Sequence, residues 1–160
     1  MKKLLIPLIA AFAANTVSAA APPQVIDIST DNVSMVLTAT PGGEVYFRHF
    51  GGRIDDTAPL AAYKSSRRGD HGTEDLAYSA QGGRNFREPA LRVTHADGDM
   101  NTELRYVSHT SKQLSDKNVT ETVVKMTDCC QALDVELVFT AYAKENVIST
   151  HAVIRNREKG

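Results

Sequence analysis

The sequence predicts an all-β protein built as an antiparallel β-sandwich. Apolar and polar residues alternate with a period of two through most of the second half of the chain. No long segment with the helical period of 3.6 follows the first twenty residues. Turn signals rich in glycine, proline and aspartate separate the alternating segments at short intervals. Several short strands with turns between them are typical of two antiparallel sheets packed face to face.

Residues 1–19 are predicted to be a secretory signal peptide. Lys2-Lys3 forms a short positive region, residues 4–14 an apolar core, and Val17-Ser18-Ala19 a small-residue cleavage pattern. The apolar run is too short to span a bilayer comfortably, and a buried N-terminal helix is the alternative. We therefore expect cleavage after Ala19 and a secreted or periplasmic protein without membrane attachment. No cysteine follows this site to suggest a lipid anchor.

The charge balance argues against nucleic acid as a partner. The full chain has a formal net charge of −1, and removal of Lys2 and Lys3 lowers it to −3. Such a surface offers no general attraction to phosphates or to anionic lipid.

The two cysteines, Cys129 and Cys130, are adjacent. A disulfide between them therefore cannot cross-link distant parts of the chain. A disulfide between neighbours closes a strained ring and is rare, and two reduced thiols at a strand boundary are the other interpretation. Neither cysteine has the spaced partners that a zinc site needs, so we expect no metal and no cofactor.

The first half of the mature chain contains three predicted strands. Residues 20–24 form an extended lead-in, because proline favours that geometry in the residue before it. Residues 25–29, 35–40 and 44–50 are the strand candidates. Pro41-Gly42-Gly43 is a good hairpin connection between the second and the third.

Residues 51–73 form an unusually long connection, rich in Gly, Asp, Ser and Arg. Connections of this length are functional or disordered. Arg67, Arg68 and Asp70 concentrate charge beside Gly69. A solvated charged loop is the simpler interpretation, and a loop that reaches a polar ligand or a neighbouring subunit is the other.

The segment from Gly82 to His109 is predicted to contain a second hairpin. Pro89 fixes its own φ and favours an extended residue before it, so a strand is expected over residues 91–95. Asp97-Gly98 is a strong turn signal, and residues 102–109 return with Leu104, Tyr106 and Ser108 on one face.

Three further strands are expected over residues 119–127, 134–142 and 147–155. In the clearest of them, Val135, Leu137, Phe139 and Ala141 share one face. The chain stops just past the last strand, which suggests that more protein follows and that the domain, residues 25–160, is incomplete at its C-terminus.

No residue pattern identifies a catalytic or metal site. Asp97-x-Asp99-x-Asn101 has the first ligand positions of a calcium loop, but Thr102 replaces the required glycine and Ser108 the final glutamate. We interpret this pattern as a hairpin turn with polar ends. The five histidines are scattered, and no spacing shows which carboxyl groups could meet as the pair that glycoside hydrolysis needs.

Residues 75–78 (DLAY) and 82–110 (GGRNFREPALRVTHADGDMNTELRYVSHT) resemble the N-terminal domain of family 36 glycoside hydrolases, the α-galactosidases. That family typically carries Glu-Tyr-Pro-x-x-Gly-x-x-Asp-Phe-Arg-x-Pro-Ala, then Asp-Leu/Met-x-Thr-Glu-Leu-Arg-Tyr. Gly82, Phe86, Arg87 and Pro89 match the first motif, whereas Asn85 stands where the family has Asp. The resemblance covers nearly all of the mature chain.

The resemblance implies part of a β-supersandwich that precedes a (β/α)₈ barrel. In the family that barrel carries two catalytic Asp residues, a nucleophile and an acid/base, and the parent enzyme removes terminal α-linked galactose from oligosaccharides by a retaining mechanism. The barrel is absent here, so this chain has no catalytic residue and is expected to be inactive alone.

The resemblance also suggests roles for individual residues. Several family members are tetramers in which N-terminal loops approach a neighbour's active site, so Arg67, Arg68 and Asp70 are the candidates for sugar contacts in a homo-oligomer. The motif residues Gly82, Phe86, Arg87 and Pro89 are expected to be structural.

Two functions from different classes remain open. The first is the N-terminal portion of a secreted α-galactosidase, which supplies scaffold and subunit contacts. The alternative is a stand-alone secreted carbohydrate-binding β-sandwich without catalysis. Such modules stack exposed aromatic rings on sugars, and this chain has no Trp and only five Tyr and five Phe residues.

Overall fold

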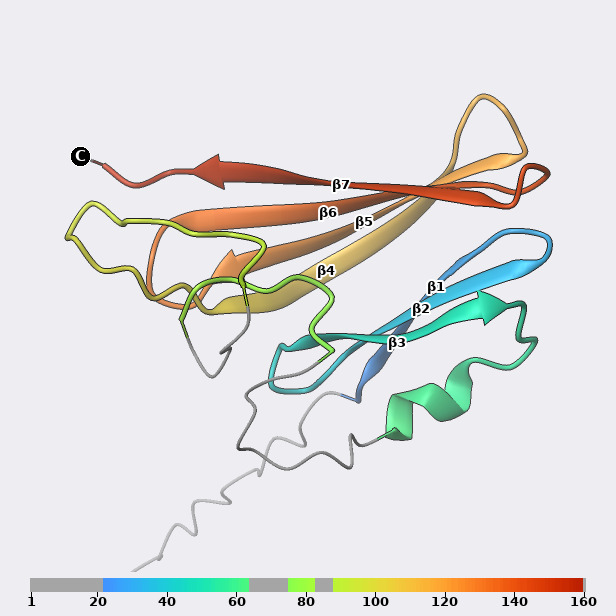
Figure 1. Cartoon of the computed structure of the whole chain (residues 1–160), viewed down its shortest axis with the longest axis horizontal. Helices are drawn as coiled ribbons and strands as arrows, with labels where there is room; N and C mark the ends of the chain where they lie inside the picture. Colours follow the sequence, from blue (N-terminus) through green and yellow to red (C-terminus); the bar gives the residue numbers. More distant parts are fainter. Residues whose placement is uncertain (1–21, 64–74, 83–87, 160) are drawn as a thin grey trace, which may run out of the picture.

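Two antiparallel sheets face each other in the computed structural model, which describes residues 22–63, 75–82 and 88–159 (Figure 1). The first sheet consists of β1 (Gln24–Ser29), β2 (Val33–Ala39) and β3 (Val45–Gly52), in that order. The second consists of β4 (Leu104–Gln113), β5 (Val119–Asp128), β6 (Leu133–Tyr142) and β7 (Val147–Asn156). The predicted all-β antiparallel sandwich is therefore confirmed.

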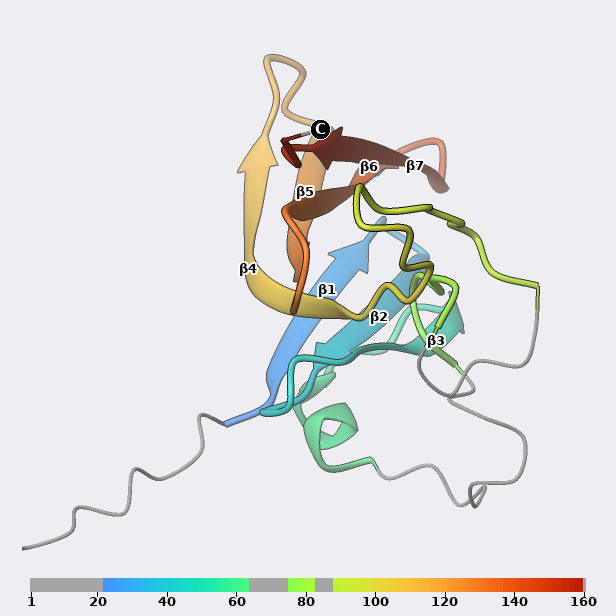
Figure 2. The ribbon, with the colours of Figure 1, turned by 90° about the vertical axis from the view of Figure 1, so that its left-hand side faces the viewer.

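The two sheets face each other (Figure 2). Apolar side chains from both inner faces fill the space between them. Along β6 every second residue is buried, as the alternation predicted. Burial of each such aliphatic side chain stabilises the fold by about 1.5–3 kcal/mol. The buried core consists of Ile26, Ile28, Leu37, Ala39, Val45, Ala80, Leu91, Val124, Met126, Leu133, Val135, Leu137, Phe139 and Ala141.

Turns at one end of the sandwich bind the two sheets together. Asn146, in the β6–β7 turn, has a positive φ of 55°. Its side-chain oxygen accepts hydrogen bonds from the Thr30 hydroxyl at 3.1 Å and from the Asn32 backbone N–H at 2.8 Å. Both donors belong to the β1–β2 turn, so the sheets cannot slide freely past each other at this end.

The β2–β3 connection is the predicted hairpin. The Thr40 N–H donates to the Glu44 carbonyl and the Gly43 N–H to the Thr40 carbonyl, each at 2.9 Å. Gly43 has a φ of +91°, a conformation that side chains disfavour.

The segment after β3 contains a short 3₁₀ helix, η1 (Ala58–Ala62), with proline in its first turn. The sequence had predicted neither a helix nor a strand within the connection of residues 51–73. The η1 helix contacts β1, and the Ile54 N–H donates to the Ser34 hydroxyl at 3.1 Å. This segment therefore lies against the outer face of the first sheet, where Ser34, Val36 and Thr38 are buried. Within the described part of the chain, no helix has the length and hydrophobicity needed to cross a membrane.

The predicted strand over residues 91–95 does not form. Only Leu91 makes a β-bridge, a parallel one with Ala80. The Asp97-Gly98 turn does close, because the His95 N–H donates to the Asp99 carbonyl at 2.8 Å and Gly98 has a φ of +86°. Among the described residues, no second strand pairs with the chain on either side of this turn, so the turn joins irregular segments.

The prediction of which side chains of residues 102–109 share a face is also wrong beyond Tyr106. The pairing of β4 with β5 shifts between Tyr106 and Ser108, so Val107 is an extra residue in a β-bulge. The bulge exchanges the two faces, and His109 takes the place expected for Ser108. The Tyr106 hydroxyl and His109 Nδ1 are therefore 2.7 Å apart.

Candidate functional site

The motif segment, defined here as residues 75–82 and 88–103, begins alongside β3 (Figure 1). Leu76 makes an antiparallel bridge with Tyr46. The Phe47 N–H donates to the Asp75 carbonyl at 2.7 Å, and the Ala77 N–H donates to the Val45 carbonyl at 2.9 Å. The segment therefore extends the edge of the first sheet before it turns toward the second.

Gly82 stands where two parts of the motif segment approach most closely. The Thr102 N–H donates to the Gln81 carbonyl at 2.8 Å, which brings Asn101 against the Gly82 backbone. Gly82 has a φ of +113°, and a Cβ at this position would lie 2.9 Å from the Asn101 Cα. Both the backbone conformation and the contact therefore make any residue with a side chain unfavourable at this position.

Arg105, at the start of β4, joins the two sheets at the end opposite Asn146. Its Nη1 donates to the Gly42 carbonyl and to Glu44 Oε1, each at 2.6 Å, and its Nη2 is paired with Glu103. The Tyr106 N–H also donates to the Gly43 carbonyl at 2.7 Å. Burial raises the pKa of Glu44, but hydrogen bonds from Thr40, the Glu44 backbone and Arg105 outweigh this and lower it.

Hydrogen bonds of His95 connect the motif segment to the chain beyond β7. It is buried, and its Nδ1 lies 2.5 Å from Glu158 Oε1 and its Nε2 3.0 Å from the Thr102 hydroxyl. Glu158 also accepts the Ala96 N–H at 2.7 Å. The hydrogen bond to Glu158 raises the pKa of His95 despite burial, and the bond from His95 lowers the pKa of Glu158.

A cavity of about 310 Å³ opens between the sheets beside the motif segment. Tyr78 and His151 are the titratable groups among its described lining residues, and no Asp or Glu is among them. It therefore offers no carboxylate pair for glycoside hydrolysis. The lining is mostly apolar and consists of Met35, Leu37, Phe47, Ala77, Tyr78, Leu137, Phe139, Thr150, His151 and Ala152.

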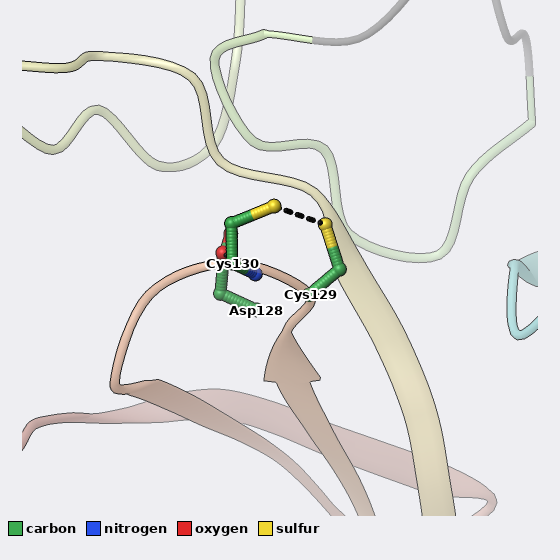
Figure 3. Close-up of side chains that lie close together, drawn as sticks. All are labelled: Asp128, Cys129 and Cys130. Atoms are coloured by element: carbon green, nitrogen blue, oxygen red, sulfur yellow. Dashed lines mark hydrogen bonds between the residues drawn. The ribbon is translucent and has the colours of Figure 1, made fainter.

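The β5–β6 turn brings Asp128, Cys129 and Cys130 together (Figure 3). Both cysteines are free and exposed, and their sulfur atoms lie 3.1 Å apart. Cys129 Sγ is 3.6 Å from Glu103 Oε2, a contact that sequence reasoning missed because 26 positions separate the two residues. The hydrogen bond to Cys130, burial and the nearby carboxylates raise the pKa of Cys129 to about 12.

Several residues singled out from the sequence lie outside the described part of the chain. These are Arg67, Arg68 and Asp70 in the long connection, and Phe86 and Arg87 in the motif. Pro89 is described and precedes Ala90, whose N–H donates to the Ser79 carbonyl at 2.9 Å. The segment 1–19 is also outside the described residues.

The calcium-like pattern is a polar turn. Asp97 Oδ1 accepts the Asp99 N–H, and Asp99 Oδ1 accepts the Asn101 N–H, each at 3.0 Å. The remaining Asp97 oxygen accepts Gln131 Nε2 at 2.8 Å. These carboxylates therefore stabilise the local backbone and tie it to the β5–β6 turn.

Comparisons with known proteins identify a domain family. A family model described as the glycosyl hydrolase family 36 N-terminal domain matches residues 43–160. A search of curated proteins found no match.

Several solved structures share this fold. The GH36 α-galactosidase AgaA from Geobacillus stearothermophilus superposes with a TM-score of 0.72 at 23% sequence identity, over 84% of this chain and 22% of that one. The α-galactosidase from Lactobacillus brevis gives 0.68 at 22% identity, over 86% and 22% of the two chains. The galactosidase domain of the α-galactosidase-sucrose kinase AgaSK gives 0.75 at 16% identity, over 85% and 22%. The chain thus spans about a fifth of the length of the solved proteins it matches.

Proposed function

Because the chain belongs to the family of glycosyl hydrolase family 36 N-terminal domains, we propose that it is the N-terminal β-sandwich of a secreted α-galactosidase. The parent enzyme hydrolyses terminal α-linked galactose from oligosaccharides, and its catalytic groups lie outside this chain. The match over residues 43–160 is the observation that carries this proposal.

The chemistry of the relatives supports the substrate class. Two solved AgaA variants are complexes with raffinose and with stachyose. The 310 Å³ cavity between the sheets lacks a carboxylate pair, so it is not a competing site for glycoside hydrolysis. The proposed role of the chain is therefore structural: it supplies a rigid support and subunit contacts for a catalytic domain.

The ties between the sheets suit this structural role. Arg105 holds the β2–β3 turn against β4, and His95 holds the motif segment against Glu158. A support of this kind keeps attached loops in place relative to a catalytic centre. Arg67, Arg68 and Asp70 are proposed to contact the sugar from such a loop, across the subunit interface of a homo-oligomer.

The test uses the longer protein that contains this chain, produced with its own N-terminus. Hydrolysis of a nitrophenyl α-galactoside, but not of the β-anomer, is expected, and the exported protein should begin at Ala20. A folded longer protein that leaves α-galactosides intact would contradict the proposal.

The loop residues are tested in the same protein. Arg67→Ala and Arg68→Ala should raise the KM for raffinose while the oligomer stays intact by light scattering. Unchanged kinetics would instead make the loop a solvated surface.

A further inference from the structure

We propose that the β5–β6 turn is a binding site for a thiophilic divalent cation such as Zn²⁺ or Cd²⁺, held by Cys129, Cys130 and Glu103. The two cysteines supply thiolates and Glu103 one carboxylate oxygen. A water molecule would fill the fourth position of a tetrahedral site.

The Cys129 thiol lies beside each of the other two ligand groups. The sulfur atoms of Cys129 and Cys130 are 3.1 Å apart and lie on the same side of the turn (Figure 3). Glu103 Oε2 is 3.6 Å from Cys129 Sγ. Arg105 pairs with the other oxygen, Oε1, so Oε2 is the atom that faces the thiol.

Asp128 holds the turn in place and is not expected to be a ligand. Its Oδ1 accepts the Cys130 and Gln131 N–H groups, each at 2.8 Å, and its Oδ2 accepts the Glu103 N–H at 2.6 Å. The Cys129 N–H donates to the Glu103 carbonyl at 3.0 Å. These bonds fix the backbone of both cysteines relative to Glu103, which lowers the entropic cost of binding a cation.

The site chemistry favours a soft cation. Thiolates select Zn²⁺, Cd²⁺ and similar ions over Mg²⁺ and Ca²⁺, which prefer oxygen ligands. Binding breaks two S–H bonds, forms two metal–sulfur bonds and releases two protons to solvent. The carboxylates of Glu103 and Asp128 surround the two thiols with negative charge. This charge disfavours a thiolate without a metal but attracts a cation.

Side-chain rotation is needed to form the site. Two thiolates at about 2.3 Å from one tetrahedral Zn²⁺ lie roughly 3.8 Å apart. Both cysteine side chains are exposed, so rotation about χ1 can open their sulfur–sulfur distance without disturbing the buried core.

The test is a Cd²⁺ titration of the reduced, metal-free chain, monitored by the ultraviolet cadmium–thiolate charge-transfer band. We expect one Cd²⁺ per chain and release of about two protons. Cys129→Ser or Cys130→Ser should abolish the band. Glu103→Gln should weaken binding at least about tenfold, since even outer-shell partners of a metal contribute that much. The matched control is Glu88→Gln, an exposed carboxylate paired with Arg92, which should leave the affinity unchanged.

Several results would overturn the cation site. The proposal fails if the titration shows no charge-transfer band, or if half a Cd²⁺ binds per chain because two molecules share one metal. It also fails if a single cysteine variant or Glu103→Gln binds Cd²⁺ with unchanged affinity. Thiol titration and intact mass, measured before reduction, test the competing state. A chain with no reactive thiol and a mass lower by two hydrogens contains a Cys129–Cys130 disulfide, which would also refute the proposal.

Discussion

Arg105 is the side chain whose removal should most clearly loosen the contact between the sheets. Arg105→Met keeps most of the apolar stem and removes the guanidinium, so the lost stability reports on its polar contacts. The guanidinium donates to the Gly42 carbonyl and is paired with Glu44 and Glu103.

The exposure of Arg105 and its partners sets the size of the expected loss of stability. Buried hydrogen bonds to charged groups contribute about 1.5–3 kcal/mol each, and fully exposed ion pairs about 0.2–1 kcal/mol. The Arg105 side chain is 32% exposed, and those of Glu44 and Glu103 are 36% and 42% exposed. We discount each ion pair for this exposure to about 0.5–1 kcal/mol and expect a total loss of about 2 kcal/mol. For a domain of this size that lowers the Tm by roughly 4–10 °C.

The assay is urea unfolding of the chain at neutral pH, followed by circular dichroism. Arg92→Met is the control, because Arg92 also pairs with a glutamate but both side chains are largely exposed, at 60% and 82%. It should cost less than about 0.5 kcal/mol. A double-mutant cycle with Glu44→Gln should show a coupling energy of about 0.5 kcal/mol or more. If Arg105→Met is no more destabilising than Arg92→Met, the clamp between the sheets does not exist as described.

Two further predictions concern the motif segment. Gly82→Ala should cost about 3 kcal/mol or more, from strain at positive φ and a backbone clash. Gly98→Ala, at a positive φ but with open space around the new Cβ, should cost about 1 kcal/mol. Gly52→Ala, with neither a positive φ nor a close contact, should be neutral or slightly stabilising. Urea unfolding of all three variants tests this ranking. The raised pKa of His95 means that its bond to Glu158 stabilises fully below the ordinary histidine value of 6.5 and is lost as pH rises through the raised value. The lowered pKa of Glu158 means that its contribution is present above the ordinary 4.5 and is lost as pH falls through the lowered value. The difference in unfolding free energy between the chain and Glu158→Gln should therefore be largest between these limits, and a flat difference across pH would disprove the pairing.

Local patterns in the sequence were enough to predict the strands of the two sheets and, for most of them, which side chains face the core. Val135, Leu137, Phe139 and Ala141 alternate without interruption and all are buried on the inner face. The hairpin at Pro41-Gly42-Gly43 also follows from turn residues alone. These features depend on neighbouring positions, which a single sequence displays directly.

Features that depend on distant contacts could not be predicted in this way. The bulge at Val107 shows no glycine or other local signal, yet it moves His109 to the face of Tyr106. The partners of His95 and Arg105 lie 63 and 61 positions away, at Glu158 and Glu44. The residues near Leu91 alternate like a strand, but in the described part of the chain they form only the single bridge from Leu91 to Ala80.

The cation site illustrates the same limit. The adjacent cysteines were visible in the sequence, but a ligand set could not be assembled from them because Glu103, which precedes β4, lies 26 positions before Cys129. The hydrogen bonds of Asp128 and the bond from the Cys129 N–H to the Glu103 carbonyl hold the β5–β6 turn beside the start of β4 and bring the carboxylate to the thiols.

The most direct test of the structural role compares the purified chain with the longer protein that contains it. We expect the chain alone to show no hydrolysis of a nitrophenyl α-galactoside and no saturable binding of raffinose by calorimetry, while the longer protein does both. Turnover by the chain alone would contradict the account, and so would tight raffinose binding, which would make the chain a sugar-binding module in its own right.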